Sequence, residues 1–211
     1  MADGLLAASP LAGTRVPRVP ETFRDAYTHG QMVALFAYLR GVRTPVGLRN
    51  LAACSLLLDC GLRAGEICRL TVDDLAGSDL ILRQTKSGRP RVVPAGARSS
   101  AALNRYLAYG RPQLRPKSAA LFVNQYGAPL NRWGLTGLLD RVGDAVGFHL
   151  NAHRFRHTAA TEWLRAGVSV ELVRRLGGWS DSEMLTRVYA HLNTADLRDV
   201  QAKASPLERL T

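Results

Sequence analysis

Apolar residues recur at helical spacing through most of the chain. Met32, Leu35 and Leu39 lie on one face of a helix, and Thr28 with Gln31 three positions later forms a capping box at its start. The same spacing predicts further helices over residues 46–59, 64–70, 97–109, 132–146, 152–166, 170–176 and 181–190. The pattern therefore predicts a mainly helical protein.

One short stretch departs from this spacing and favours β-structure. Runs rich in branched apolar residues over 79–83 and 89–94 predict two strands. Between them lies Lys86-Ser-Gly88, which suits the turn of a β-hairpin because glycine tolerates a positive φ. The predicted fold class is therefore mainly α with a small antiparallel β-sheet, an α+β arrangement.

The distribution of Gly, Pro and helix-capping residues predicts a single compact domain preceded by a flexible N-terminal segment. Residues 1–21 contain Gly, Ser and three prolines with little apolar periodicity, which is typical of a flexible lead-in. Asn131 and Ser169 are predicted to cap the helices that follow them. The tail from residue 194 is expected to include a last helix interrupted by Pro206.

Charge and composition narrow the partners and the compartment. The 211-residue chain has 28 Lys and Arg against 17 Asp and Glu, a net charge of +11 that favours a polyanion such as nucleic acid. No apolar run approaches the ~18–20 residues needed to span a bilayer, and the N-terminus has no basic region followed by an apolar core. We expect no membrane association, a cytoplasmic location, and three reduced thiols: Cys54, Cys60 and Cys68.

The residues that carry chemistry gather towards the C-terminal half. His153 and Arg156 are three positions apart, so on a helix they share a face and can bind one oxyanion. Trp179 follows a Gly-Gly break, and ten positions later Tyr189 is a candidate nucleophile. Two further cations stand upstream, Arg63 and Lys86. Imidazole, guanidinium and phenol aimed at one point suit phosphodiester chemistry without a metal.

In their order and spacing these residues resemble the catalytic domain of the tyrosine recombinase (phage integrase) family. The family's pattern is an Arg in a Gly-Leu-Arg-x-x-Glu segment, a Lys in a β-hairpin, a His-x-x-Arg box, a His or Trp after a Leu-Gly pair, and a Tyr. The matching residues are Arg63, Lys86, His153, Arg156, Trp179 and Tyr189. The resemblance implies a catalytic domain over residues 22–211.

The resemblance also implies a role for each residue. Tyr189 would attack the scissile phosphate and form a 3′-phosphotyrosyl bond, while Lys86 would donate a proton to the leaving 5′ oxygen. Forked guanidinium donors suit phosphate oxygens, and a histidine of pKa ~6.5 can act as general acid or base. Trp179 stands where many members have His, and its indole can only donate a hydrogen bond.

Several polar residues near these positions are expected to support them. They are Glu66, His157 and His191. Tyr106, Tyr109 and Tyr126 lack the Gly-Gly-Trp lead-in and are interpreted as packing residues. Thr85-Lys86-Ser87-Gly88 lacks the frame of a P-loop, and no carboxylate trio stands in a metal-binding setting. We therefore expect no cofactor and no metal.

The function implied by the resemblance is site-specific recombination of double-stranded DNA. Family members usually act as tetramers on two synapsed sites, and residues 194–211 are the candidate contact with a neighbouring subunit. Three alternatives stay open: a type IB-like topoisomerase, a non-catalytic DNA-binding remnant, and a metal-dependent nuclease. The usual N-terminal helical domain has no counterpart before residue 22, so fewer phosphate contacts and a shallower salt dependence are expected.

Overall fold

The computed structural model describes residues 26–83 and 90–179, together with residues 185 and 198. The longer helices are α1 (His29–Gly41), α2 (Pro45–Asp59), α3 (Ala64–Arg69), α4 (Ala97–Arg105), α5 (Arg132–Val146), α6 (Ala152–Arg165) and α7 (Val170–Gly177). The strands and shorter helical turns are η1 (Val72–Asp74), β1 (Leu75–Ala76), β2 (Asp79–Leu82), β3 (Arg91–Pro94), η2 (Tyr106–Gly110) and η3 (Pro112–Leu114). The predicted fold class is confirmed.

Local signals explain where the first two helices begin. The side chain of Thr28 accepts a hydrogen bond from the backbone N–H of Gln31 at 3.2 Å, and the Gln31 side chain accepts one from the N–H of Thr28 at 3.0 Å. This is the predicted capping box. Helix α2 begins at Pro45, one residue before the predicted start, because a proline at the first helical position lacks only an N–H that would be unpaired anyway.

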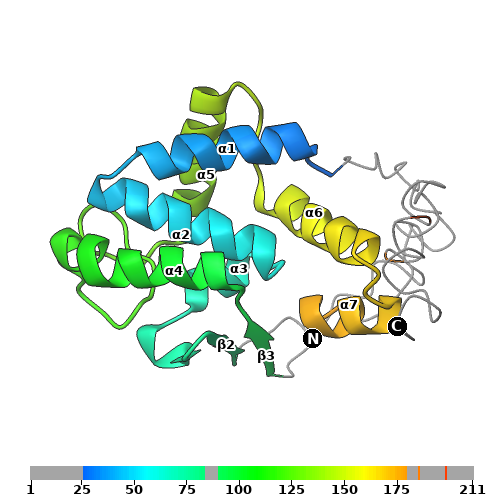
Figure 1. The fold of residues 1–211 in the computed structure, drawn as a ribbon. Helices are drawn as coiled ribbons and strands as arrows, with labels where there is room; N and C mark the ends of the chain where they lie inside the picture. The colour runs from blue at the N-terminus through cyan, green and yellow to red at the C-terminus, as the bar shows by residue number, and fades with distance from the viewer. Residues whose placement is uncertain (1–25, 84–89, 180–184, 186–197, 199–211) are drawn as a thin grey trace, which may run out of the picture.

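Helix α2 forms the centre of the domain. It contacts α1, α3, α4 and α6, and in Figure 1 it lies between α1 and α4. Leu56, Leu57 and Cys60 are fully buried at its C-terminal end. A helix that is apolar on nearly every side can only be accommodated inside a core. The end of α2, where Arg63 follows, is therefore fixed by packing.

A second, smaller cluster joins α6 to α7. Ala160 and Leu164 of α6 pack with Val173 of α7 and with Leu185, and Trp179 borders the group. Figure 1 shows α6 and α7 on one side of the domain, away from α4. This cluster sets the position of the α7 C-terminus relative to α6.

The sheet has three antiparallel strands in the order β1-β2-β3. Leu75 pairs with Leu80 across β1 and β2, and Leu82 pairs with Arg91 across β2 and β3. The sequence predicted only the β2–β3 hairpin, because a two-residue strand such as β1 shows no alternation. The turn with Lys86 lies outside the described residues.

The predicted helix over 97–109 is present, but its last part is not an α-helix. Helix α4 ends at Arg105 and passes into the π-helical turn η2, in which the N–H of Arg111 reaches the carbonyl of Tyr106 at 2.7 Å. Tyr106 is buried and stacks on Phe122, as expected of a packing residue. Tyr109 and Tyr126 do not fit that interpretation: their side chains are exposed, because η2 and the 124–128 turn direct them outward.

Among the helices that the structure describes, none has the length and apolar character needed to cross a membrane.

Candidate active site

Arg63 lies at the junction between α2 and α3. Gly61 follows the C-cap of α2 with a φ of +57°, a left-handed conformation that favours glycine, and turns the chain towards α6. Arg63 is then the extended N-cap residue of α3. Its backbone N–H donates to Glu66 Oε2 at 2.9 Å, and its Nη1 donates to Glu66 Oε1 at 3.0 Å. The Arg63 side chain stays 27% exposed, so it can still reach a ligand.

Glu66 is buried between two arginines. Besides Arg63, it receives a bidentate pair from Arg91 of β3, with Nη1 to Oε1 at 2.8 Å and Nη2 to Oε2 at 3.0 Å. Burial by itself would raise the pKa of Glu66, but the hydrogen bonds from Arg91 and Arg63 outweigh it and lower the pKa below its ordinary value. The carboxylate is therefore ionised at neutral pH.

Arg156 enters the same region from α6. It is buried, with 5% of the residue exposed, and its Nη1 donates to the carbonyl of Gly61 at 2.6 Å. Its Nη2 is buried and has no hydrogen-bond partner among the residues that the structure describes. Burial, together with the charges of Arg63 and Arg91, lowers the pKa of Arg156 to about 9. A buried cation with an unsatisfied donor is a site prepared for an anion.

The C-terminal end of α7 completes the cluster. The N–H of Trp179 donates to the carbonyl of Arg174 at 3.0 Å, and that of Gly178 donates to Arg175 at 3.2 Å, which is the Schellman pattern. Through this turn the indole of Trp179 packs on Arg156, whose Cζ lies 3.8 Å from the ring centroid. The carbonyl of Gly178 also accepts a hydrogen bond from Arg63 Nη2 at 2.7 Å.

The two predicted histidines lie on α6 near Arg156. His153 is exposed in the first turn, after the N-cap Asn151, and among the described residues it makes no hydrogen bond or ion pair with the arginine cluster. Both ring nitrogens of His157 are buried. His153 and Arg156 are expected from their spacing to share one face of the helix. In the structure His153 lies at the surface, whereas Arg156 lies in the interior.

Three predicted site residues are not placed by the structure. Lys86, Tyr189 and His191 lie outside the described residues. Besides the two histidines, four predicted residues come from three separate segments: Arg63 and Glu66 from the N-cap and first turn of α3, Arg156 from α6, and Trp179 from the turn after α7. The fold brings these four together.

Sequence reasoning missed Arg91. The sequence pattern places Arg91 in a strand and indicates no role for it, whereas in the structure it forms the bidentate pair with Glu66 and also donates from Nε to the carbonyl of Leu176 at 3.2 Å. A usable signal was present. Residues two apart on a strand share a face, so Arg91 lies on the same side as the buried Val93. An arginine on the core face of a strand indicates a buried ion pair.

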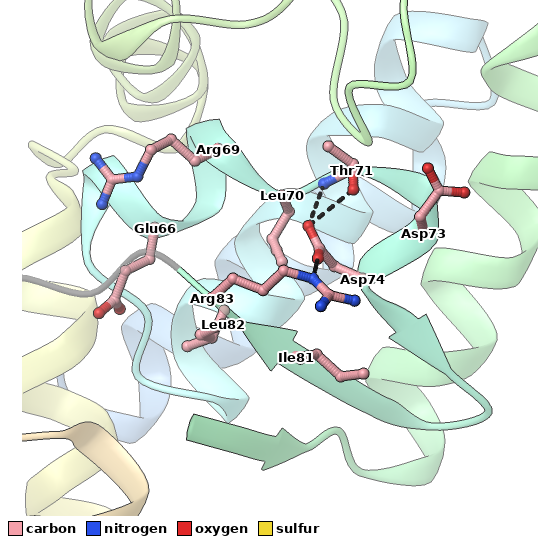
Figure 2. A pocket seen from close by; sticks show the side chains of 9 residues that line it. All are labelled: Glu66, Arg69, Leu70, Thr71, Asp73, Asp74, Ile81, Leu82 and Arg83. Carbon is pink, nitrogen blue, oxygen red and sulfur yellow. Dashed lines mark hydrogen bonds and ion pairs between the residues drawn. The ribbon is translucent and has the colours of Figure 1, made fainter. Parts of the chain in front are cut away.

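A neighbouring pocket of about 330 Å³ lies between α3, η1 and β2. Figure 2 shows Asp74 at its centre, accepting hydrogen bonds from the N–H and hydroxyl of Thr71 and from Nε of Arg83. The carboxylate of Glu66 lies at the pocket's edge and points away from Asp74 (Figure 2). The Asp74–Arg83 pair fixes the end of β2, immediately before the segment that contains Lys86.

Within the described ranges, no group of three or more His, Cys, Asp or Glu side chains is placed to hold a metal ion.

A helical domain that gathers arginines from distant segments around one buried carboxylate defines a site for an oxyanion. The family model described as the phage integrase family matches residues 26–196. The chain therefore belongs to the phage integrase family, the tyrosine recombinases.

Individual relatives agree with this assignment. Tyrosine recombinase XerD of Corynebacterium glutamicum is 33% identical over 210 residues, which cover 97% of this chain and 69% of that protein. Tyrosine recombinase XerC of Bacillus pumilus is 32% identical over 97% of this chain and 69% of its own length. The chain spans about two thirds of the length of these relatives.

Solved structures share the fold. The crystal structure of XerA recombinase matches with a TM-score of 0.72 and 24% identity, over 86% of this chain and 65% of that one. A lambda integrase dimer bound to a COC′ core site matches with a TM-score of 0.65 and 16% identity, over 88% of this chain and 53% of that one.

Proposed function

We propose that the chain cleaves and rejoins DNA strands at specific sites through a 3′-phosphotyrosyl bond to Tyr189. The proposal rests on the proximity of two arginines, Arg156 and Arg63, whose charges affect each other. Arg156 has a buried Nη2 that lacks a partner among the described residues, and Arg63 is partly exposed beside it. A phosphodiester bound between them would meet two guanidinium groups at once.

Charge balance explains why two arginines suit this reaction. Attack on a phosphodiester builds negative charge on the two non-bridging oxygens, and fixed cations stabilise that charge without reorganising. Arg63, Arg91 and Arg156 surround the single carboxylate of Glu66. The cluster therefore keeps an excess positive charge in a partly buried place, where it acts more strongly than in water.

The remaining chemistry is assigned by the family pattern. Tyr189 supplies the nucleophilic phenolic oxygen, which bonds to phosphorus as the 5′ oxygen leaves. Lys86 donates the proton that the leaving oxygen takes up. His153, exposed in the first turn of α6, exchanges protons with solvent or substrate, and His157 and His191 support the arrangement. Bond energy stays in the phosphotyrosyl ester, so that a 5′ hydroxyl can later restore the phosphodiester.

The substrate class is double-stranded DNA. A net charge of +11 supports a polyanionic partner. Matched structures include XerH site-specific recombinase bound to a palindromic difH substrate, at 22% identity and a TM-score of 0.67.

Recombination between two sites needs four subunits, and residues 194–211 are proposed to contact the next subunit. A chain shortened to residue 193 would then cleave DNA but fail to assemble on paired sites, which sedimentation with DNA would measure.

The test of the proposed function is covalent capture on nicked duplexes. A pool with randomised sequence around the nick loses its short leaving strand after cleavage, which traps any protein–DNA adduct for denaturing electrophoresis. Wild-type protein should yield an adduct in the presence of EDTA, and Tyr189→Phe should bind DNA equally and yield none. The same adduct from Tyr189→Phe, or binding without any wild-type adduct, would contradict the proposal. Relaxation of supercoiled plasmids that lack the selected sequence would instead indicate a topoisomerase.

A further inference from the structure

Arg91 differs from the other arginines of the site in how its donors are used. Nη1 and Nη2 bind the two oxygens of Glu66, and Nε binds the carbonyl of Leu176. The side chain is only 12% exposed. All three nitrogens are therefore directed at groups inside the protein.

Arg63 and Arg156 are less fully occupied, although Arg63 also donates from Nη1 to Glu66 and from Nη2 to the carbonyl of Gly178. Arg63 is more than twice as exposed as Arg91, at 27% against 12%. Arg156 keeps a buried Nη2 without a partner among the described residues. Substrate can thus be bound by Arg63 and Arg156, whereas Arg91 would have to give up bonds to Glu66 or Leu176 to reach it.

The contacts of Arg91 link three elements that are distant in sequence. It belongs to β3, its carboxylate partner belongs to α3, and its carbonyl partner belongs to the last turn of α7. A Cβ on Gly178 would lie 2.7 Å from Arg91 Nη1, and Gly178 has a φ of +66°. Only glycine at this position lets the turn before Trp179 sit directly against the guanidinium.

We infer that Arg91 is a positioning residue of the active site, a role that rests on the proposed function. Through Glu66 it fixes the orientation of Arg63, which shares Glu66 Oε1. Through Leu176 and Gly178 it fixes the turn that carries Trp179, which in turn covers Arg156. Both phosphate-binding arginines thereby depend on one residue that does not touch the phosphate.

Removing Arg91 has a specific electrostatic consequence. Three cations face Glu66: Arg63 from the start of α3, Arg91 from β3 and Arg156 from α6. Without Arg91, the carboxylate stays buried but loses its bidentate partner, so its pKa rises. Glu66 then takes up a proton at a higher pH and releases Arg63, and cleavage should be lost on acidification earlier than in wild type.

The experiment compares cleavage by Arg91→Met, Arg91→Lys and Arg165→Met on a captured nicked substrate at saturating DNA, from pH 5 to pH 9. Arg165→Met is the matched control, because Arg165 also pairs with a glutamate, Glu162, but on an exposed helix face. Arg91→Met should bind DNA as tightly as the control and cleave about 10²-fold more slowly, the scale expected for a small misplacement of catalytic groups. The fall of its cleavage rate on acidification (the acid limb of the pH profile) should begin at a higher pH than in wild type.

Arg91→Lys keeps the charge but cannot form the bidentate pair. It should cleave at an intermediate rate with a smaller shift of the acid limb, and it serves as the informative variant if Arg91→Met fails to fold. Weakened DNA binding with an unchanged cleavage rate would show that Arg91 binds phosphate and would overturn the inference. Normal rates and pH profiles in both variants would also overturn it, while a wild-type adduct would leave the proposed function standing. If wild-type protein gives no adduct, both fail.

Discussion

The indole ring of Trp179 covers one face of the Arg156 guanidinium, with Cζ 3.8 Å from the ring centroid. The carbonyl of Gly61 holds Nη1 of the same guanidinium at 2.6 Å. Arg156 is thereby held on one face and at one corner, and its buried Nη2, which has no partner among the described residues, is the donor that remains for a ligand. A tryptophan in this place orients a cation, a task that needs no proton transfer.

Trp179→Ala should therefore slow cleavage, because Arg156 loses the surface that fixes its plane. Cation–π contacts of this kind are worth about 0.5–2 kcal/mol, so a modest fall in unfolding free energy is also expected. Trp179→Phe keeps an aromatic face and should retain most of the activity. Cleavage rates and urea unfolding of the two variants test this. Equal loss in both would assign the role to the indole N–H instead.

Arg63→Ala and Arg156→Ala should each reduce cleavage by about 10²–10³-fold, as the loss of one preorganised donor typically does. Circular dichroism should show a folded domain in Arg63→Ala. Arg156→Ala also leaves the buried Gly61 carbonyl without its donor, so its unfolding free energy should fall by about 1–3 kcal/mol. A folded variant with the wild-type cleavage rate would remove that arginine from the site.

Lys86 is tested by changing the leaving group. If it protonates the leaving 5′ oxygen, Lys86→Ala should cleave ordinary DNA slowly. A substrate with sulfur in the 5′-bridging position has a leaving group that hardly needs a proton, so the variant should recover most of its rate. Arg63→Ala is the control, since it should stay slow on both substrates. If Lys86→Ala is equally slow on both, the lysine binds phosphate and another group is the acid.

The lowered pKa of Glu66 predicts how the free energy of unfolding changes as the pH falls. Its pKa is lower in the folded protein than the ordinary value of ~4.3 in the unfolded chain. The stabilisation is therefore complete above the unfolded pKa and is lost as pH falls through the folded pKa. Glu66→Gln should be less stable than wild type at pH 7, and the difference should shrink below about pH 4. Urea unfolding from pH 7 to pH 3 measures it. A constant difference would mean that the carboxylate's charge is irrelevant.

Helices with a clear N-cap and a continuous apolar face could be predicted from the sequence. The predicted helix over 132–146 matches α5, because Asn131 caps its start and its apolar stripe is continuous. The π-helical end of α4 had no such signal. It is defined by the i→i+5 bond from the N–H of Arg111 to the carbonyl of Tyr106, and it accompanies the packing of Tyr106 against Phe122, which is a tertiary contact.

The candidate site likewise contains residues that sequence motifs indicate and residues that only tertiary contacts reveal. Arg63 and Arg156 were found by their motifs, but their common anchor, the Gly61 turn, comes from the packing of α2 on α6. Arg91 belongs to none of the motifs that indicate the site. Its importance depends on a register in which Leu82 faces Arg91 and on the approach of the α7 end, and neither can be read from one strand alone.

The bond from Arg63 to the carbonyl of Gly178 joins residues 115 positions apart. During synthesis the helical core around α2 can form long before this partner leaves the ribosome, whereas contacts of such separation close late. Until the turn after α7 is made, Arg63 lacks its carbonyl anchor and Arg156 lacks its aromatic cover. A nascent chain can therefore hold a folded core and basic surface without an assembled cleavage centre.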